Sequence, residues 1–406
     1  MNYMVTSAAD VTPATPAGGR EAAAQALRRV HRTAAELRRG SPVLLVGEKP
    51  GQSLLLAAME TVSAAGLAEL AGLAAGPAVL LLAPARALAL LPDPRADPRA
   101  DPRADPRADA AGPPGTALGA VTALAAPAGL LDPVLLRGFA DPTAEHLLPA
   151  PAGQVPAPPL GALALTLAKL GRLLPALVAA PAPVLAPPHL LAVAAADLAA
   201  YPISVATSLK RVAEAVVPLA EAPEARIVAF RAADGGIEHL AILVGQPEAL
   251  AAAGGAPLVR VHSECFTGDL LGSLRCDCGP QLRGAIARMA AEDGGVLLYL
   301  AQEGRGIGLV NKLRAYALQD TGLDTLDANR ALGWGADERN FLVAATMLHE
   351  LGIQRVRLLT NNPEKLRALA ACGVEVEGRE AHQFAPNGVN DGYLETKARR
   401  FGHLLA

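Results

Sequence analysis

The stretch at residues 338–373, ERNFLVAATMLHELGIQRVRLLTNNPEKLRALAACG, decides the fold class. Its first part has the apolar spacing of an amphipathic helix, and QRVRLLT has the composition of a buried strand. Asn362 then suits the N-cap of a second helix, and Pro363 suits its first helical position. Helix, strand and helix in succession predict an α/β domain whose sheet is largely covered.

The same alternation extends upstream of this stretch. Residues 281–291 have a helical period, GVLLYL at 295–300 is typical of a strand, and residues 308–319 have a helical pattern again. The composition changes near YPISVATSLKRVAE, because the chain before it is dominated by Ala, Leu and Pro. We therefore predict an α/β (α+β) protein of two domains, with the following divisions: a flexible N-terminus at 1–20, a first domain at 21–203 and a second domain at 208–406.

A perfect tetrapeptide repeat, DPRADPRADPRADPRAD, occupies residues 93–109 of the first domain. Proline at every fourth position forbids a regular helix, and the alternating charges keep the segment solvated. We predict a disordered surface loop there.

The charge balance, the N-terminus and the most apolar windows bear on nucleic-acid binding, membrane insertion and location. The chain has 406 residues, with 36 Lys and Arg against 39 Asp and Glu, so it has no basic excess for nucleic acid. The N-terminus lacks the pattern of a secretory signal. The most apolar windows are interrupted by Pro77, Pro84 and Arg86, or by Lys169 and Arg172, which favours buried core over membrane spans. We expect a cytoplasmic protein with no nucleic-acid or membrane partner.

Three of the four cysteines lie close together in SECFTGDLLGSLRCDCG, at residues 263–279. In a reducing compartment such a cluster favours metal binding or catalysis over disulfides. Cys265, Cys276 and Cys278 alone would leave the fourth position of a zinc ion open, as in catalytic sites, whereas His262 as a fourth ligand would close it, as in structural sites. A disulfide would leave one thiol over. The spacing alone leaves catalytic and structural zinc open.

The motifs around the cysteines suit an anionic ligand. QEGRGIGL at 302–309 places glycines around an arginine, which allows backbone to approach a phosphate closely. GADER places Asp337 and Arg339 at the predicted start of a helix, and LLTNNPEK forms a strand-to-helix turn of the kind that binds anions. Their joint occurrence beside a thiol cluster favours a phosphate-bearing ligand over solvated surface charge.

The second domain resembles the catalytic domain of GTP cyclohydrolase II, from about residue 209 onward. The resemblance rests on RVHSECFTGDLLGSLRCDCGPQL, LLYLAQEGRGIGLVNKLRAYALQD, DTLDANRALGWGADERNF and VRLLTNNPEKL, and ETKARRFGHLL is similar to the family's C-terminal tail. It implies a mixed sheet with flanking helices. It also implies that GTP is the substrate, in the first step of riboflavin biosynthesis, and that the protein is a homodimer.

The resemblance assigns roles to individual residues. It implies that Cys265, Cys276 and Cys278 hold one Zn²⁺ per chain, whose bound water attacks C8 of guanine so that this carbon leaves as formate. Tyr316 matches a tyrosine near the reacting ring. The positions that match GTP-binding residues of the family are Arg260, Val261, His262, Ser263, Glu264, Gln281, Glu303, Gly304, Arg305, Thr325, Thr360 and Lys365.

The resemblance also implies Mg²⁺ on the triphosphate and release of pyrophosphate. Arg339 matches a proposed nucleophile toward the α-phosphate, and Asp337 matches its proton acceptor. Because a guanidinium group stays protonated in water, an electrostatic role for Arg339 in the transition state is kept as the alternative.

The first domain resembles 3,4-dihydroxy-2-butanone-4-phosphate synthase only faintly. Where that family has an acidic run after its first strand, this chain has VGEKPGQSLLLAA, and where it has His-Thr-Glu, this chain has PPLGALALTLAKLG. Glu48 alone cannot supply both Mg²⁺ ligands and a base. We therefore expect a degenerate, catalytically silent synthase-like domain. A bifunctional enzyme and a non-catalytic zinc- and GTP-binding sensor or scaffold are the alternatives.

Overall fold

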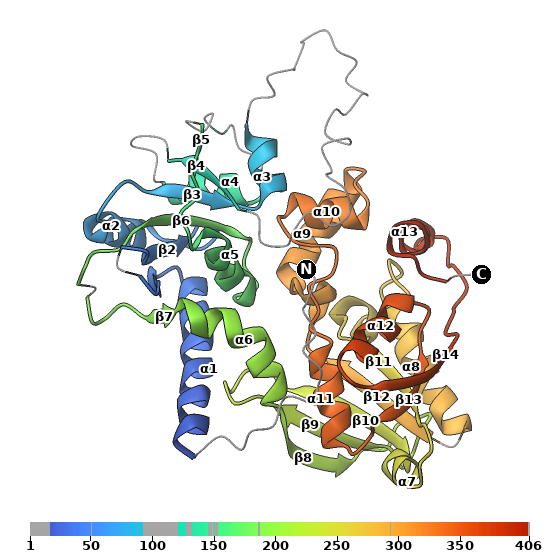
Figure 1. The fold of residues 1–406 in the computed structure, drawn as a ribbon. Helices are drawn as coiled ribbons and strands as arrows, with labels where there is room; N and C mark the ends of the chain where they lie inside the picture. The colour runs from blue at the N-terminus through green and yellow to red at the C-terminus, as the bar shows by residue number, and fades with distance from the viewer. Residues whose placement is uncertain are drawn as a thin grey trace.

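The computed structural model describes residues 17–49, 51–91, 121–126, 132–144, 148, 153–185, 187–292 and 294–404. These residues form two mixed seven-stranded sheets, one in each half of the chain, with helices packed against them (Figure 1). The α/β class is therefore confirmed. The repeat at 93–109 and residues 1–16 lie outside the described residues, whereas residues 17–20, expected to be flexible, begin helix α1.

The N-terminal sheet has the strand order β5-β4-β3-β6-β2-β1-β7, in which only the β1–β7 pair is parallel. Its strands are β1 (Val43–Val46), β2 (Leu54–Ala58), β3 (Val79–Leu82), β4 (Thr122–Ala125), β5 (Gln154–Val155), β6 (Ala176–Pro181) and β7 (Ala192–Ala194). The helices of this half are α1 (Ala17–Arg38), α2 (Ala64–Leu73), α3 (Pro84–Leu90), α4 (Pro133–Ala140), α5 (Gly161–Leu170) and α6 (Ala195–Thr207).

Both faces of this sheet are buried. Successive residues of a strand point to opposite faces, so Leu55 of β2 enters one apolar core while Leu54 and Leu56 enter another. Helices α1, α5 and α6 cover the second of these cores. This two-sided burial accounts for the continuous apolar runs in the sequence. Among the helices of the described residues, none is long and apolar enough to cross a bilayer.

The C-terminal sheet has the order β14-β13-β11-β12-β10-β9-β8. Its strands are β8 (Lys210–Val216), β9 (Arg226–Arg231), β10 (His239–Gly245), β11 (Leu258–Ser263), β12 (Gly294–Leu300), β13 (Arg355–Leu359) and β14 (Glu375–Glu380). Strands β12, β11, β13 and β14 run parallel to one another. The carboxyl ends of β11, β12 and β13 therefore meet at one edge, which is where open α/β sheets bind ligands.

The C-terminal half has seven helices among the described residues. They are α7 (Pro247–Ala252), α8 (Cys278–Ala291), α9 (Leu309–Asp320), α10 (Thr325–Ala331), α11 (Leu342–Glu350), α12 (Pro363–Ala371) and α13 (Asp391–Phe401). Of these, α7, α8, α11 and α12 pack against the sheet of this half. The predicted cap of α12 is confirmed, because the Asn362 side chain accepts a hydrogen bond from the backbone N–H of Glu364 and Pro363 opens the helix.

One helix begins later than predicted. Asp337 and Arg339 were expected at the start of a helix, but α11 begins only at Leu342. The Asn340 side chain accepts a hydrogen bond from the backbone N–H of Leu342, at 3.1 Å, and so satisfies one of the free donors at the helix N-terminus. The preceding residues form a loop, which leaves Asp337 and Arg339 free of helical geometry.

The two halves share one hydrophobic core. Helices α9 and α10 of the C-terminal half lie against the N-terminal sheet rather than against their own (Figure 1). The C-terminal residues that enter this core are Ile307, Ala315, Leu318, Ala328, Leu332 and Trp334. They pack with Leu80, Leu124 and Phe139 of the N-terminal half. The halves are therefore expected to unfold together.

We predict that Leu332→Ala lowers the free energy of unfolding by about 2 to 5 kcal/mol, the usual cost of a cavity at a buried leucine. Leu332 is 1% exposed. Trp334 is the chain's one tryptophan and lies in the same core, so its fluorescence reports on this contact during urea unfolding. Circular dichroism reports on both halves. The transitions followed by fluorescence and by circular dichroism should coincide, and Leu332→Ala should shift both to lower urea concentration. A dichroism transition at the wild-type urea concentration would show that the halves unfold independently.

Candidate functional site

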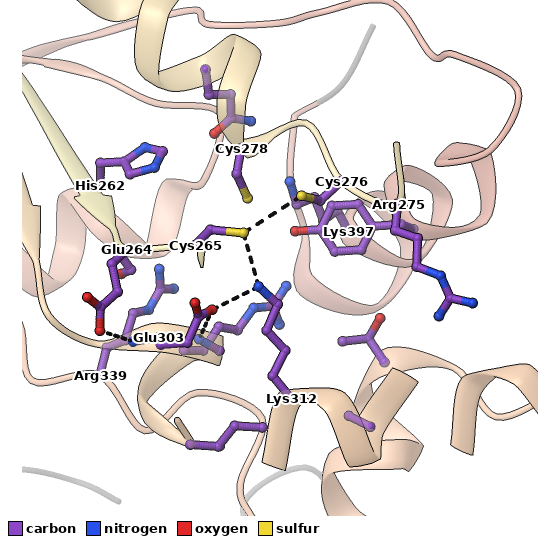
Figure 2. A pocket seen from close by; sticks show the side chains of 18 of the residues that line it. His262, Glu264, Cys265, Arg275, Cys276, Cys278, Glu303, Lys312, Arg339 and Lys397 are labelled. Carbon is purple, nitrogen blue, oxygen red and sulfur yellow. Dashed lines mark hydrogen bonds and ion pairs between the residues drawn. The ribbon is translucent and has the colours of Figure 1, made fainter. Parts of the chain in front are cut away.

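A pocket lies at the carboxyl edge of strands β11, β12 and β13, and Figure 2 shows it from close by. It brings together sixteen of the residues that the sequence predicted as ligands, binders or catalytic groups, namely Arg260, His262, Ser263, Glu264, Cys265, Cys276, Cys278, Gln281, Glu303, Gly304, Arg305, Tyr316, Thr325, Arg339, Thr360 and Lys365. Val261 and Asp337 do not line it. Instead, the backbone carbonyl of Val261 accepts a hydrogen bond from Lys365 Nζ at 2.9 Å, and Asp337 pairs with Arg339.

The three clustered cysteines converge to form a metal-sized group. Their sulfur atoms lie within 4.8 Å of one another, and Cys265 Sγ is 3.8 Å from Cys276 Sγ. Tetrahedral zinc with Zn–S bonds of about 2.3 Å separates two sulfur ligands by about 3.8 Å, so the trio fits this ion. The separation is far longer than a disulfide bond of about 2.05 Å, which removes the disulfide alternative.

The loop between the first two cysteines needs a glycine. A Cβ atom on Gly268 would lie 2.7 Å from Cys276 Sγ and 3.0 Å from Cys265 Sγ. The loop forms a turn of π-helix at Phe266–Leu270, and the Gly268 N–H donates to Cys265 Sγ at 3.3 Å. This turn brings the sulfur of Cys265 back toward those of Cys276 and Cys278.

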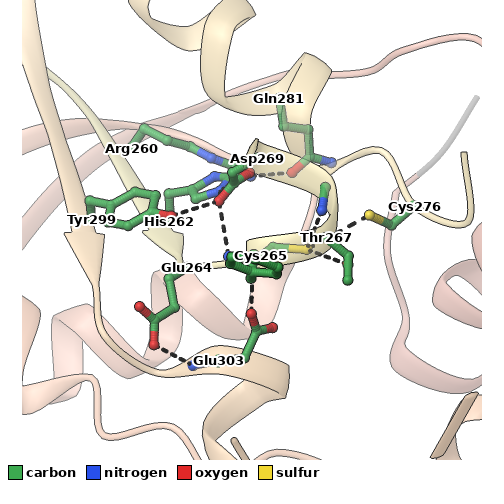
Figure 3. Close-up of polar contacts among 12 residues, drawn as sticks. Arg260, His262, Glu264, Cys265, Thr267, Asp269, Cys276, Gln281, Tyr299 and Glu303 are labelled. Carbon is green, nitrogen blue, oxygen red and sulfur yellow. Dashed lines mark hydrogen bonds and ion pairs between the residues drawn. The ribbon is translucent and has the colours of Figure 1, made fainter. Parts of the chain in front are cut away.

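His262 is not a fourth member of the sulfur group. Its Nε2 atom lies 3.1 Å from both carboxylate oxygens of Asp269, and its ring stacks on Tyr299 (Figure 3). Asp269 also accepts hydrogen bonds from the Tyr299 hydroxyl and the Cys265 N–H. His262 therefore helps to orient the cysteine loop through Asp269, and the arrangement favours a site with three protein ligands.

The three thiols shift one another's pKa through their hydrogen bonds. Hydrogen bonds from the Cys276 and Cys278 thiols lower the pKa of the Cys265 thiol, and Lys312 acts in the same direction. The same bond to Cys265 raises the pKa of Cys276 to about 11. Cys265 is thus the first of the three to ionise, and an ionised sulfur is the form that binds a metal.

Lys312 is a site residue that the sequence reasoning missed. Its Nζ atom lies 3.0 Å from Cys265 Sγ, 2.9 Å from Thr267 Oγ1 and 2.8 Å from Glu303 Oε1. Burial opposes its charge, yet the hydrogen bonds to Glu303 and Cys265 raise the pKa of the ammonium group above its usual value. The signal in the sequence was its spacing: Lys312 lies four residues before Tyr316, on the same face of α9.

Glu303 joins the cysteine loop to the glycine-rich turn. Its Oε2 accepts from the Phe266 N–H at 2.7 Å, and its Oε1 accepts from Lys312 and from the Gly304 N–H. Both carboxylate oxygens are therefore engaged within the protein. The turn that follows is left-handed, with φ of 64° at Gly304 and 62° at Arg305. Arg305 is strained there, because a side chain disfavours this region.

Four cationic side chains gather in the pocket, of which those of Arg260 and Lys365 are buried and the other two are half-buried. Arg260, Arg305, Arg339 and Lys365 all line it. Burial, followed by the charges of Arg260 and Arg339, lowers the pKa of Lys365 well below its usual value. Burial likewise lowers the pKa of Arg305. Such mutual repulsion in a desolvated place is relieved by a bound polyanion.

Arg339 is the one cation of this group with a full ion pair. Its Nε atom donates to Asp337 Oδ1 at 2.8 Å and to Oδ2 at 3.1 Å, and its Nη2 atom also bonds to Oδ2. Burial opposes the charge of Arg339, but Asp337 raises the pKa of the guanidinium group. Burial also opposes the charge of Asp337, whose pKa Arg339 lowers. Both members of the pair are therefore ionised.

Strand β11 presents polar atoms that lack a partner among the described residues. Arg260 Nε, His262 Nδ1 and Ser263 Oγ are buried without a hydrogen bond, although most buried polar atoms in proteins have one. All three residues line the pocket. Arg260 is otherwise held by the Leu359 carbonyl at 2.9 Å and by Gln281 (Figure 3). Three unpaired buried atoms on one strand suit a ligand that supplies the missing hydrogen bonds.

Helix α13 and the residues after it form part of the pocket lining, and the sequence patterns did not predict this. Tyr393, Lys397 and His403 line the pocket beside the predicted residues. Lys397 Nζ lies 2.5 Å from Asp277 Oδ1, and both side chains are under 10% exposed. Asp277 is the residue between Cys276 and Cys278, so this ion pair holds the cysteine loop against the C-terminal helix.

Comparisons with known proteins agree with this geometry. The family model of GTP cyclohydrolase II matches residues 210–381. A GTP cyclohydrolase-2 of Azospirillum brasilense is 60% identical over 250 residues, which cover 60% of this chain and 64% of that protein, a little under two thirds of its length. A GTP cyclohydrolase-2 of Actinobacillus succinogenes is 49% identical over 198 residues, which cover 48% of this chain and 88% of that protein.

Among solved structures, a two-domain 3,4-dihydroxy-2-butanone 4-phosphate synthase from A. baumannii aligns with 88% of this chain and all of that chain, at 20% identity and a TM-score of 0.31. The assignment to a family rests on the sequence relatives alone. Since the chain aligns with most of the Actinobacillus protein at 49% identity, it belongs to the GTP cyclohydrolase II family of enzymes.

Proposed function

We propose that this protein hydrolyses GTP to 2,5-diamino-6-(5-phospho-ribosylamino)pyrimidin-4(3H)-one, with release of formate and pyrophosphate, as the first step of riboflavin biosynthesis. The observation that carries the proposal is the presence, in one pocket, of a zinc-sized thiol trio and of four cations that repel one another. The thiols suit chemistry at the guanine ring, and the cations suit a triphosphate. Family membership supports the same reaction.

In this proposal Cys265, Cys276 and Cys278 hold one Zn²⁺ per chain. When bound, the ion would supply Lewis-acid activation of water for attack on C8 of guanine. Tyr316 lines the same pocket, and the cations of Arg275 and Lys312 lie 5.0 Å and 5.7 Å from its ring centroid. In this proposal Tyr316 orients the opening ring. Glu303 and Lys312 hold the cysteine loop against the glycine-rich turn through hydrogen bonds to Phe266 and Cys265.

The phosphates would lie on the side of Arg305, Arg339 and Lys365, with Mg²⁺ carried in by GTP. Charge on the phosphoryl oxygens grows as the bond between the α- and β-phosphates breaks, and fixed cations in a site shielded from water stabilise it. Gln281, Thr325 and Thr360, together with the unpaired atoms of β11, offer the polar contacts that fix the nucleoside. GTP thus spans the pocket from thiols to cations.

For the N-terminal half we propose a degenerate synthase-like domain without catalytic activity of its own. Its sequence lacks the carboxylates that a Mg²⁺-dependent sugar-phosphate rearrangement requires, since Glu48 stands alone in VGEKPGQSLLLAA. Conversion of a pentulose phosphate by the purified protein would contradict this and favour a bifunctional enzyme. We further propose division at residues 21–203 and 208–406, a homodimeric state and a cytoplasmic location.

The test of the function is to incubate the purified protein with GTP, Mg²⁺ and Zn²⁺ and to measure formate and pyrophosphate together. We expect both products in equal amounts. If the protein binds zinc and GTP tightly yet releases neither product, it is a nucleotide sensor or scaffold instead.

A further inference from the structure

Two charged residues interrupt the apolar stretch LGALALTLAKLGRLLPALVAA of the N-terminal half, and both reach the C-terminal half. Lys169 lies in the last turn of α5, and Arg172 follows the helix. Lys169 Nζ is 2.5 Å from Glu338 Oε1, and the side chains are 21% and 17% exposed. Arg172 Nη2 donates to the Ala301 carbonyl at 2.9 Å.

The partner of Lys169 connects the two loops that carry the pocket's arginines. Glu338 lies between Asp337 and Arg339, and its N–H donates to the Arg305 carbonyl at 3.1 Å. The loops also touch through their backbones, because a Cβ atom on Gly306 would lie 3.0 Å from the Glu338 carbonyl carbon. The Glu338 carboxylate accepts from the Gly335 N–H as well, at 2.8 Å. A shift of Glu338 would therefore move both arginines.

Arg172 braces the glycine-rich turn from the same side. Its side-chain carbons lie 3.1 to 3.5 Å from where a Cβ atom on Gly308 would stand, so glycine permits the contact. Its backbone carbonyl accepts from Asn311 Nδ2 at 3.0 Å, and the same amide group donates to the Ile307 carbonyl. Arg172 itself has a φ of 56°, a region that side chains disfavour. Glycine adopts this conformation freely, whereas the arginine side chain adopts it at a local cost.

We propose that Lys169 and Arg172 are positioning residues for the GTP site, so that the N-terminal half, silent in its own chemistry, sets the placement of Arg305 and Arg339. This inference rests on the proposed function, because its effect is on the groups that hold the phosphates. Lys169 acts through Glu338, and Arg172 acts through the turn at residues 301–311. Neither touches the substrate.

The test compares Lys169→Met and Arg172→Gly with the wild-type protein. We expect kcat/KM for pyrophosphate and formate release to fall about 10- to 100-fold, mainly in kcat, since a displacement near 1 Å in a catalytic group has an effect of this size. The thermal midpoint of Arg172→Gly should not fall, because glycine relieves the strained φ. Lys210→Met is the matched control, since Lys210 forms a surface pair with Glu350 away from the pocket.

Two further variants separate positioning from general stability. Lys169→Arg keeps the charge and should recover most of the activity. The double variant Lys169→Met/Glu338→Gln should lose no more kcat/KM than the more impaired of the two single variants, because both substitutions act through one contact. Activities of Lys169→Met and Arg172→Gly within twofold of wild type, or losses that only follow the thermal midpoint, would overturn the proposal.

The affinity for GTP, measured by calorimetry on the same zinc-loaded variants, keeps this test separate from that of the proposed function. If the wild type binds GTP without turnover, the reaction proposed above is wrong, and the positioning role is then judged on binding alone. In that case both variants should weaken GTP binding about tenfold relative to wild type and Lys210→Met, and unchanged binding would overturn the inference.

Discussion

Replacing Cys276 with serine is expected to abolish formate release while GTP still binds. Loss of one sulfur from the trio leaves two ligands and a hydroxyl, which cannot retain zinc at a site built for thiolates. Without metal activation of water the ring-opening barrier rises by about 4 kcal/mol or more, which is a loss of about 10³-fold. Arg305, Arg339 and Lys365 line the pocket without belonging to the sulfur trio, so pyrophosphate release should persist in part.

Three measurements on one preparation decide this prediction: zinc content per chain, formate release and pyrophosphate release. Cys372→Ser is the matched control, because Cys372 follows α12, packs against the C-terminal core and is remote from the trio. It should keep zinc and both products. Formate release at the wild-type rate by a zinc-free Cys276→Ser protein would rule out a catalytic role for the metal.

The sequence was sufficient for features that depend on local chemistry. The apolar periods predicted helices α8, α9, α11 and α12 and strands β12 and β13 of the C-terminal half, and the Asn362–Pro363 pair predicted the start of α12. The spacing of the cysteines predicted a metal site, but it left His262 open as a ligand. That question needed the contact of His262 with Asp269, seven residues away on a π-helical turn that no periodicity indicates.

Contacts between distant segments could not be predicted. Asp277 separates two cysteines, and its partner Lys397 lies 120 residues further along the chain. Lys169 and Glu338 are 169 residues apart. In the sequence, Lys169 and Arg172 appeared only as interruptions of an apolar run, because local patterns record that a charge is present and not what it meets. The division of the chain by composition likewise gave no sign that α9 and α10 pack into the core of the other half.

The ion pair of Arg339 with Asp337 favours one of the two roles considered for this arginine. A covalent nucleophile requires a neutral guanidine nitrogen, yet Asp337 raises the pKa of Arg339 despite its burial. The Nε and Nη2 atoms are both occupied by the Asp337 carboxylate. We therefore propose that Arg339 stabilises charge on the phosphates and that Asp337 orients it. Removal of a fixed donor of this kind from a transition state reduces the rate by about 10²- to 10³-fold.

We accordingly predict that Arg339→Ala slows pyrophosphate release by about 10²- to 10³-fold, and that Arg339→Lys, which keeps the charge but loses the two-point contact with Asp337, recovers about tenfold of that loss. Single-turnover pyrophosphate release measures both rates, and Arg399→Ala, at an exposed position of α13, is the control for loss of an arginine. Intact-protein mass spectrometry of wild-type protein quenched during turnover should show no added nucleotide. A guanylyl adduct on Arg339, together with an Arg339→Lys protein as inactive as Arg339→Ala, would instead establish the covalent route. The two mechanisms differ in whether charge alone suffices at this position, and lysine supplies charge without the guanidine nitrogen.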